Sequence, residues 1–338
     1  MIRTTVIGSW PLPEMYRERL LQYHRGTLPE MLIKPTLVGA AEIAIREQKA
    51  TGVTQFMGGE FFAEVFIQHL PRKLTGVKLV KPQAAELKAY TDLAEYELTD
   101  DIDAPHGLGY IEAFRRESQL EPTLEKASVP GPLEVLAHIR PTPEVQRQIS
   151  RAIEIVNREI HGLAAAGARE IQLDIPYIAI RSVLGQLAPE EAVDLIARSF
   201  AGVEALKTIH CCLGDLGSQS AITVHNLHAL LPYIERLRGV IDKVHLECSH
   251  AGQWADRACL RDIPKELQDK DTKKILARLD SSEFWIGYSN SLKFIRGYML
   301  KQAALLQITQ ARLTKKTKQR DETIKVFCNF VGSADYSD

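Results

Sequence analysis

Apolar and polar residues alternate along this chain in a way that predicts short buried strands separated by longer amphipathic helices. Short apolar runs that end in Gly, Pro, Asp or Glu are typical of buried strands. They occur at residues 4–9, 53–58, 126–130, 169–174, 207–212, 243–247 and 284–287. Apolar residues at helical spacing predict helices at residues 39–50, 131–139, 143–166, 189–200, 220–237 and 291–309.

The repeated order of strand and helix implies parallel strands that are joined by helical crossovers. Polar residues stand at the carboxyl ends of the predicted strands, where a (β/α)8 barrel carries its functional groups. An open doubly wound sheet also has parallel strands, but no Gly-rich phosphate loop follows the first predicted strand. The sequence therefore favours an α/β fold of the (β/α)8 TIM-type barrel class.

The length of 338 residues suits one barrel domain over residues 1–338. Two regions depart from the regular alternation. The polar segment of about residues 75–121 is expected to be an insertion or hairpin after the second strand, and the seventh strand is expected to be irregular. A C-terminal tail is expected over about residues 311–338.

Composition argues against some partners and compartments. A formal net charge of −1 gives no general attraction to nucleic acid or to an anionic membrane. No stretch approaches the roughly 20 apolar residues of a membrane span, and the first residues lack a signal-peptide layout. Five cysteines, two of them adjacent, do not suggest a disulfide framework in so long a chain. We therefore expect a cytoplasmic protein.

Two predicted strands end in residues that commonly bind metals. Residues i and i+2 of a strand point to the same face, so His210 and Cys212 project together while Cys211 points away. The same alternation places Glu247 on the face of His245. Imidazole, thiolate and carboxylate groups form a zinc ligand set, and three protein ligands leave a position for a reactant. This pattern predicts a zinc site.

Short motifs stand at five of the predicted strands. They are Thr5-Val6-Ile7-Gly8-Ser9-Trp10-Pro11, Gly59-Glu60, Val129-Pro130-Gly131-Pro132, Ile171-Gln172-Leu173-Asp174-Ile175-Pro176, and the His-x-Cys of residues 210–212 with its downstream Glu247. In this order and spacing they resemble the C-terminal catalytic domain of cobalamin-independent methionine synthase, in the superfamily that also contains uroporphyrinogen decarboxylase-like barrels. The resemblance extends roughly over residues 4–304.

The resemblance implies a zinc ion that binds the sulfur of homocysteine as a thiolate, the nucleophile that methyl transfer needs. The zinc ligands that it implies are His210, Cys212 and Glu247. Members of this family hold the amino acid end of homocysteine with an Ile-Gly-Ser backbone segment and two acidic side chains. The matching residues are Ile7, Gly8, Ser9, Glu60 and Asp174.

The chain departs from the family pattern in several ways. Asn290 stands where the family has its fourth zinc ligand, a cysteine, and Ile175 replaces an acidic residue that often follows Asp174. Three ligands with water or substrate would still form a catalytic site, or His245 could substitute as a ligand. The seventh strand of the family carries a histidine for which we find no match. Full-length members have a second, amino-terminal barrel that helps to bind methylfolate, whereas this chain has the length of one barrel.

Three hypotheses follow for the function. The favoured one is a zinc-dependent methyltransferase that moves a methyl group onto a thiol, with homocysteine as acceptor and methionine as product. Its methyl donor would be methylfolate or a methyl-corrinoid protein. The second is a divergent zinc-dependent thiol alkyltransferase or C–S lyase that acts on another thiol, and the third is a non-catalytic accessory protein. Metal analysis and methylation assays discriminate between them.

Overall fold

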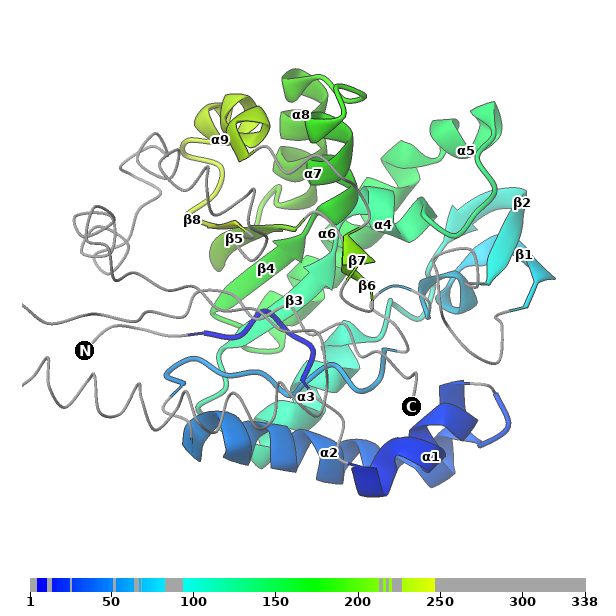
Figure 1. The fold of residues 1–338 in the computed structure, drawn as a ribbon, viewed down its shortest axis with the longest axis vertical. Coiled ribbons are helices and arrows are strands. Elements are labelled where there is room, and N and C mark those ends of the chain that lie inside the picture. The colour runs from blue at the N-terminus through cyan, green and yellow to red at the C-terminus, as the bar shows by residue number, and fades with distance from the viewer. Residues whose placement is uncertain are drawn as a thin grey trace, which may run out of the picture.

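A parallel β-sheet forms the centre of the protein (Figure 1). The computed structural model describes residues 5–10, 14–24, 26–50, 53–63, 67, 69–82, 94–212, 215–216, 219–220 and 227–246. The sheet contains, in spatial order, β3 (Lys126–Pro130), β4 (Glu170–Asp174), β5 (Leu206–Cys211) and β8 (Lys243–Leu246). The fold is thus α/β, and the strands of the described residues form an open arc without closure into a barrel.

Helices accompany the strands along the chain. They are α1 (Glu14–His24), α2 (Glu30–Ala50), α3 (Tyr110–Leu120), α4 (Pro132–Leu136), α5 (Pro143–Arg147), α6 (Ile149–Ala165), α7 (Pro176–Val183), α8 (Pro189–Ser199) and α9 (Leu231–Arg236). Short 3-10 turns are η1 (Leu70–Lys73) and η3 (Leu227–Leu230). The remaining strands form two antiparallel pairs, β1 (Thr75–Lys81) with β2 (Glu95–Asp103), and β6 (Asp215–Leu216) with β7 (Gln219–Ser220).

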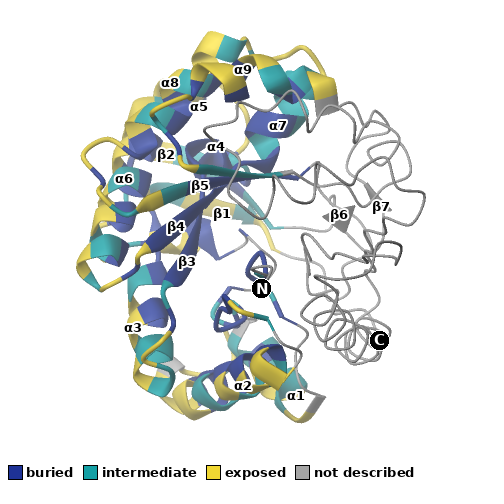
Figure 2. Cartoon of the chain, turned by 90° about the vertical axis from the view of Figure 1, so that its left-hand side faces the viewer, coloured by how far each residue is buried: buried dark blue, intermediate teal, exposed yellow. Residues whose placement is uncertain are grey.

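The two faces of the parallel sheet differ in chemistry. The apolar face packs into the main hydrophobic core with α6 and α8 and carries Ala127, Val129, Ile171, Leu173, Ile209, Cys211 and Val244. The other face, called the polar face below, carries Lys126, Ser128, Glu170, Gln172, Asp174, Thr208, His210, Lys243 and His245. Strands in parallel sheets are usually apolar on both faces because both are buried. β3 and β4 are buried along their whole length and β5 over its last four residues (Figure 2), so the polar face of these strands requires a functional explanation.

The register of the sheet aligns the polar face in rows. Pro130 of β3, Asp174 of β4, His210 of β5 and His245 of β8 are successive partners across the sheet. Two residues earlier, Ser128, Gln172, Thr208 and Lys243 form the row beneath. Because paired residues of neighbouring strands lie side by side, candidate site residues from distant parts of the sequence become neighbours.

The sequence pattern predicted these four strands closely. β3 has the expected bounds, β4 and β8 differ from expectation by one residue at one end, and β5 begins and ends one residue earlier than expected. The helix at residues 189–200 is α8, which ends one residue earlier than expected. Gly167 has a φ of 104° just after α6, as expected for a glycine that ends a helix.

The strands expected at residues 4–9 and 53–58 are wrong in extent. Within the described residues they are joined by a single parallel bridge and form no continuous ladder. Side chains take the place of a neighbouring strand: the buried amide of Gln48 accepts from the backbone N of Met57 at 3.0 Å and donates to its O at 2.9 Å. These segments are therefore extended but bonded by side chains.

Several expected helices also need correction. The helix expected at residues 39–50 begins earlier, as α2, and the one at 131–139 is the shorter α4. The helix at residues 143–166 is divided at Gln148 into α5 and α6, and the buried side chain of Gln148 bonds β2 at this point. Of the helix expected at residues 220–237, Ser220 belongs to β7, residues 227–236 form η3 and α9, and residues 221–226 lie outside the described residues. Helices α1, α3 and α7 were not expected from the pattern.

Residues 75–121 contain the antiparallel pair of β1 and β2 followed by α3. Helix α3 packs against α6 and β3. The strand at residues 284–287, the helix at 291–309, the tail at 311–338 and the irregular seventh strand lie outside the described residues.

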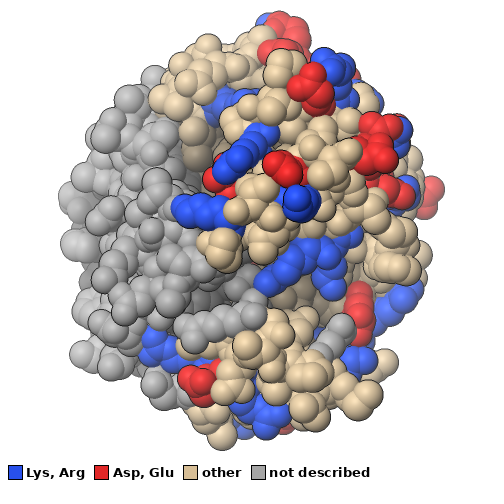
Figure 3. Space-filling view, turned by 90° about the vertical axis from the view of Figure 1, so that its right-hand side faces the viewer, with Lys and Arg blue, Asp and Glu red and all other residues tan. Residues whose placement is uncertain are grey.

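Charged side chains of both signs lie beside one another on the face drawn in Figure 3. Exposed ion pairs include Arg151 with Asp101 at 2.6 Å and Arg147 with Glu144 at 2.8 Å. Such pairs contribute on the order of 0–1 kcal/mol, so burial carries most of the stability. Among the helices that the structure describes, none is long and apolar enough to cross a bilayer.

We expect replacement of Gln48 by Leu to lower the free energy of unfolding by about 2 kcal/mol, because both backbone groups of Met57 would lose their partners. Urea denaturation measures the difference. Gln119→Leu on the exposed side of α3 is the matched control and should leave stability nearly unchanged. Equal stability of the two variants would show that the Gln48 amide does not hold this segment.

Candidate active site on the polar face

His210 lies at the carboxyl end of β5 and is only 1% exposed. Both of its ring nitrogens are buried, and neither has a hydrogen-bond partner among the residues described. Burial, with the nearby charge of Lys126, lowers the pKa of His210 to about 3, so the ring is neutral. A neutral imidazole with buried, unsatisfied nitrogens is suited to binding a metal ion or a substrate donor.

Cys212 directly follows β5 and is buried. The intervening Cys211 faces the other way, as alternation predicted: its sulfur lies 3.4 Å from the hydroxyl of Tyr233. Burial raises the pKa of Cys211 to about 12, which makes it an unreactive core thiol. His210 and Cys212 are therefore the members of this strand that can serve the polar face.

Glu247, the third predicted zinc ligand, follows β8 and lies outside the described residues, as does Asn290. Among the residues described, His, Cys, Asp and Glu side chains form no group of three that could hold a metal ion. The predicted ligand set thus remains a prediction, of which His210 and Cys212 lie two residues apart at the end of β5.

Glu60 lies between the amino-terminal segment and β3. Its carboxylate accepts hydrogen bonds from the hydroxyl of Ser9, at 2.8 Å, and from the hydroxyl of Ser128. A Cβ atom at Gly8 would stand 2.3 Å from Glu60 Oε1, so only glycine permits this close approach. Glu60 itself has a φ of 58°, in the left-handed region that follows Gly59. The structure thus brings Gly8, Ser9 and Glu60 together.

Asp174 ends β4 and is 3% exposed. Its Oδ1 accepts a hydrogen bond of 2.6 Å from the side-chain amide of Gln172. The same amide donates to the backbone O of Ile7 at 2.8 Å. Gln172 therefore connects two of the predicted substrate-binding positions.

The carboxyl groups of Glu60 and Asp174 form an electrostatically coupled pair. Burial raises the pKa of both, and the charge of Glu60 raises that of Asp174 further, well above its usual range. Two buried carboxyl groups resist simultaneous ionisation unless a positive charge lies between them. An ammonium group of a ligand would provide that charge.

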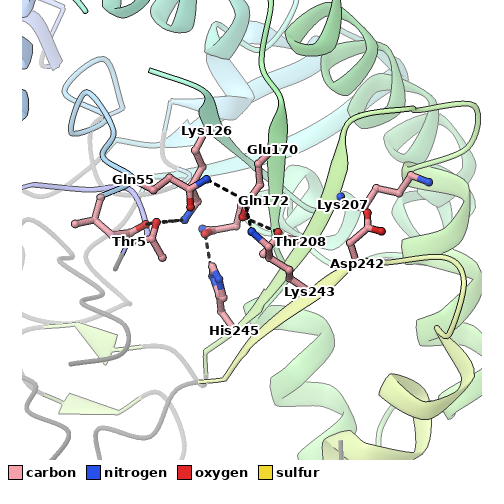
Figure 4. Close-up of polar contacts among 11 residues, drawn as sticks. Thr5, Gln55, Lys126, Glu170, Gln172, Lys207, Thr208, Asp242, Lys243 and His245 are labelled. Carbon is pink, nitrogen blue, oxygen red and sulfur yellow. Dashed lines mark hydrogen bonds and ion pairs between the residues drawn. The ribbon is translucent and has the colours of Figure 1, made fainter. Parts of the chain in front are cut away.

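A hydrogen-bonded cluster fills the polar face beneath these groups (Figure 4). Glu170 accepts hydrogen bonds from Gln55 at 2.9 Å, Thr208 at 2.8 Å and Lys243 at 2.6 Å. Burial alone would raise the pKa of Glu170, but the bonds and charge of Lys243 and its other partners lower it below the usual value. Glu170 is therefore an ionised, fully bonded anchor.

Lys126 is fully buried and holds the amino-terminal segment. Its ammonium donates to the backbone O of Val6 at 2.6 Å and to the hydroxyl of Thr5 at 3.0 Å. Burial lowers the pKa of Lys126 to about 8, while the charges of Glu170 and Asp174 act in the opposite direction. The backbone before Ile7 is thus fixed by a side chain of β3.

Sequence reasoning missed this cluster and the role of Gln172. The available signal was the presence of polar residues at alternate positions of each strand: 126 and 128, 170 and 172, 208 and 210, and 243 and 245. Alternation placed these residues on one face, but their pairing depends on the register between strands, which a single strand pattern does not contain.

Comparison with known proteins gives an independent result. A family model described as "Cobalamin-independent synthase, Catalytic domain" matches residues 2–230. A methionine synthase of Pyrococcus abyssi is 26% identical over 224 residues, which are 64% of this chain and 62% of that protein. A methionine synthase of Saccharolobus solfataricus is 22% identical over 339 aligned positions, covering 95% of this chain and 97% of that protein.

A solved structure has a similar fold. It is a B12-independent methionine synthase from Shewanella sp. W3-18-1 in complex with selenomethionine, with a TM-score of 0.70 and 17% sequence identity. The match covers 93% of this chain and 99% of that chain. The chain spans less than two thirds of the Pyrococcus relative but almost the whole of the other two proteins.

The raised pKa of Asp174 predicts a pH dependence of stability. An acid with a raised pKa in the folded protein adds stability that is complete below its usual pKa of 3.8 and is lost as pH rises through the folded value. We therefore expect the contribution of Asp174 to the free energy of unfolding to fall as pH rises above about 4, so that the stability of wild type relative to Asp174→Asn decreases with rising pH.

Urea denaturation at several pH values measures this slope. Asp194→Asn, on the exposed side of α8, is the control and should keep the wild-type slope. Identical slopes for wild type and Asp174→Asn would mean that Asp174 is ionised in the free protein as readily as in the unfolded chain.

Proposed function

This chain belongs to the cobalamin-independent methionine synthase family of methyltransferases, and we propose its function from that membership and from the geometry of the polar face. We infer that it transfers a methyl group to the sulfur of homocysteine and produces methionine. The observation that carries this proposal is the convergence, at one end of the polar face, of a neutral buried His210 with the carboxyl pair of Glu60 and Asp174. The imidazole of His210 suits a sulfur-binding metal, and the carboxyl pair of Glu60 and Asp174 suits an amino group.

The proposed architecture is a (β/α)8 barrel that forms a single domain over residues 1–338. Three features of the described part support it. The strands are parallel, helices cover their apolar face, and polar residues line the opposite face where a barrel has its interior. The amino-terminal segment and residues 53–60 lie beside β3 through Lys126 and Ser128, where the first two barrel strands would stand.

Zinc is the metal that the donor chemistry suits best. His210 is neutral and its nitrogens lack partners among the described residues, which is the state that a ligand requires. Cys212 supplies a sulfur on the same face, and we propose Glu247 as the oxygen ligand. A nitrogen, sulfur and oxygen set is typical of zinc sites with an open position. Bound zinc would supply the positive charge that keeps a substrate thiol as thiolate at neutral pH.

The amino acid end of homocysteine would bind opposite the metal ligands. Its ammonium group would lie between the carboxyl groups of Glu60 and Asp174, and its arrival would lower the raised pKa of each. The backbone of Ile7, Gly8 and Ser9 would hold the substrate carboxylate, with Lys126 and Gln172 fixing the segment from behind. The chain itself therefore orients the substrate before the transfer.

The transfer is a direct substitution at carbon. The substrate sulfur forms a bond to the methyl carbon, and the bond between that carbon and the donor breaks with its electron pair remaining on the donor. We propose methylfolate or a methyl-corrinoid protein as the donor, and assays with both distinguish them. The hypotheses of another thiol substrate and of a non-catalytic role remain the alternatives that the same assays exclude or support.

The purified protein is expected to contain about one zinc ion per chain and to methylate homocysteine with one of the two donors. His210→Ala and Cys212→Ser should lose most of both properties, because each removes a ligand. Cys211→Ser is the matched control: it changes the neighbouring thiol on the opposite face and should keep zinc and activity. Elemental analysis and methionine production measure the two properties.

Two outcomes contradict the proposal. A wild-type protein that neither contains zinc nor binds added zinc would exclude the metal-based chemistry. Methylation of another thiol in preference to homocysteine would move the chain to the second hypothesis, with the zinc site retained.

A further inference from the structure

Gln172 of β4 lies on the polar face between two parts of the proposed amino acid site. Its side chain is fully buried, with Ser128 and Thr208 as its partners on the neighbouring strands. The side-chain amide contacts the backbone of Ile7 and the carboxyl group of Asp174. Because a buried amide without partners is costly, these contacts constrain where both of its neighbours can lie.

The contacts of Gln172 determine the orientation of its amide. The backbone O of Ile7, 2.8 Å away, can only accept a hydrogen bond, so the amide atom facing it is the nitrogen. The second hydrogen of this nitrogen is directed to Asp174 Oδ1 at 2.6 Å. The amide oxygen lies 3.2 Å from Nδ1 of His245 on β8. Both hydrogens of the amide are therefore donated within the amino acid site.

The carboxyl group of Asp174 depends on this amide for its position. Gln172 is the one side chain of the described residues that donates a hydrogen bond to it. Glu60, the other carboxyl group of the pair, differs, because hydroxyl groups of Ser9 and Ser128 hold both of its oxygens. The bond to Oδ1 of Asp174 fixes one oxygen and leaves Oδ2 as the oxygen that can accept from a ligand.

The chemistry of an amide suits this position. A lysine or arginine in place of Gln172 would neutralise Asp174 and repel the ammonium group of a substrate, and an acidic residue would repel Asp174. The amide donates to the carboxyl group without adding a charge. Asp174 is thus held in place while its negative charge stays available to an ammonium group.

The amino-terminal segment is held at two successive residues. Lys126 donates to the backbone O of Val6 at 2.6 Å, and Gln172 donates to the backbone O of Ile7. The same nitrogen of Gln172 also bonds Asp174. The separation between Ile7 and Asp174 therefore depends on Gln172, whereas the position of the segment as a whole also depends on Lys126.

We propose that Gln172 is the positioning residue for recognition of the substrate amino group. Its amide sets the separation of Asp174 from the backbone of Ile7, so that an ammonium group fits between Asp174 and Glu60. The inference rests on the proposed function, because it concerns the amino acid end of the substrate. It adds that recognition of the amino group, rather than of the sulfur or the carboxylate, depends on Gln172.

A pair of ligands separates this role from a general effect on the fold. L-Methionine carries the ammonium group, and γ-(methylthio)butanoate is the same molecule without it. We expect Gln172→Met to weaken methionine binding by about 10-fold to 100-fold, the loss typical of a hydrogen bond to a charged group. The affinity for γ-(methylthio)butanoate should change by less than about 3-fold, because Lys126 still fixes the segment that holds the carboxylate. Calorimetric titration of the full chain measures both affinities.

Thr208→Val is the matched control. Thr208 is the partner of Gln172 on β5 and is equally buried. Its hydroxyl donates a hydrogen bond to Glu170 rather than to Ile7 or Asp174. The variant therefore removes one buried hydrogen bond from the same face of the sheet, and it should keep the wild-type ratio of the two affinities.

The outcomes distinguish this inference from the proposed function. Equal losses of affinity for the two ligands in Gln172→Met, or no loss for either, would overturn the inference and leave the amino acid site intact. If circular dichroism shows that Gln172→Met does not fold, Gln172→Asn decides. It keeps an amide on a side chain one methylene shorter and should show the same selective loss of methionine, and an unselective or absent loss overturns the inference. A wild-type protein that binds neither methionine nor homocysteine would overturn the proposed function and the inference with it.

Discussion

The polar face of the parallel sheet is the constraint on which the rest of the structure depends. Burying a polar group without a partner costs about 1–3 kcal/mol, so a sheet with polar residues on its inner face requires a complete set of partners from elsewhere in the chain. Glu170 obtains three donors, from three different segments. Lys126 and Gln172 donate hydrogen bonds to backbone oxygens of the amino-terminal segment, which is thereby fixed against the sheet.

The polar groups have fewer hydrogen-bond partners toward the carboxyl ends of the strands. At the amino end of the face, Glu170 is fully bonded and its pKa is lowered. At the carboxyl end, Asp174 has a raised pKa, and the nitrogens of His210 have no partner among the described residues. The hydrogen-bonded cluster around Glu170 therefore acts as a rigid base, and Asp174 and His210 at the carboxyl end are able to interact with the charges that a ligand brings.

The sequence alone predicted the local features well. The buried strands β3, β4, β5 and β8 have distinct apolar runs with clear ends, and alternation correctly separated Cys211 from the polar face. The amino-terminal segment was misread as a strand because its backbone bonds come from Lys126 and Gln172, which are more than a hundred residues away. The contact between Gln172 and His245 likewise depends on the register of three strands, which no local pattern contains.

The proposed function requires that this site bind an amino acid with its sulfur as a thiolate. Calorimetric titration near pH 7.5, in buffers of different ionisation enthalpy, measures the protons released when a ligand binds. Homocysteine and methionine share the amino acid end, so the responses of Glu60 and Asp174 cancel in the comparison. We expect homocysteine to release about one proton more than methionine, because its thiol is bound as thiolate. Equal proton release by the two ligands would contradict it.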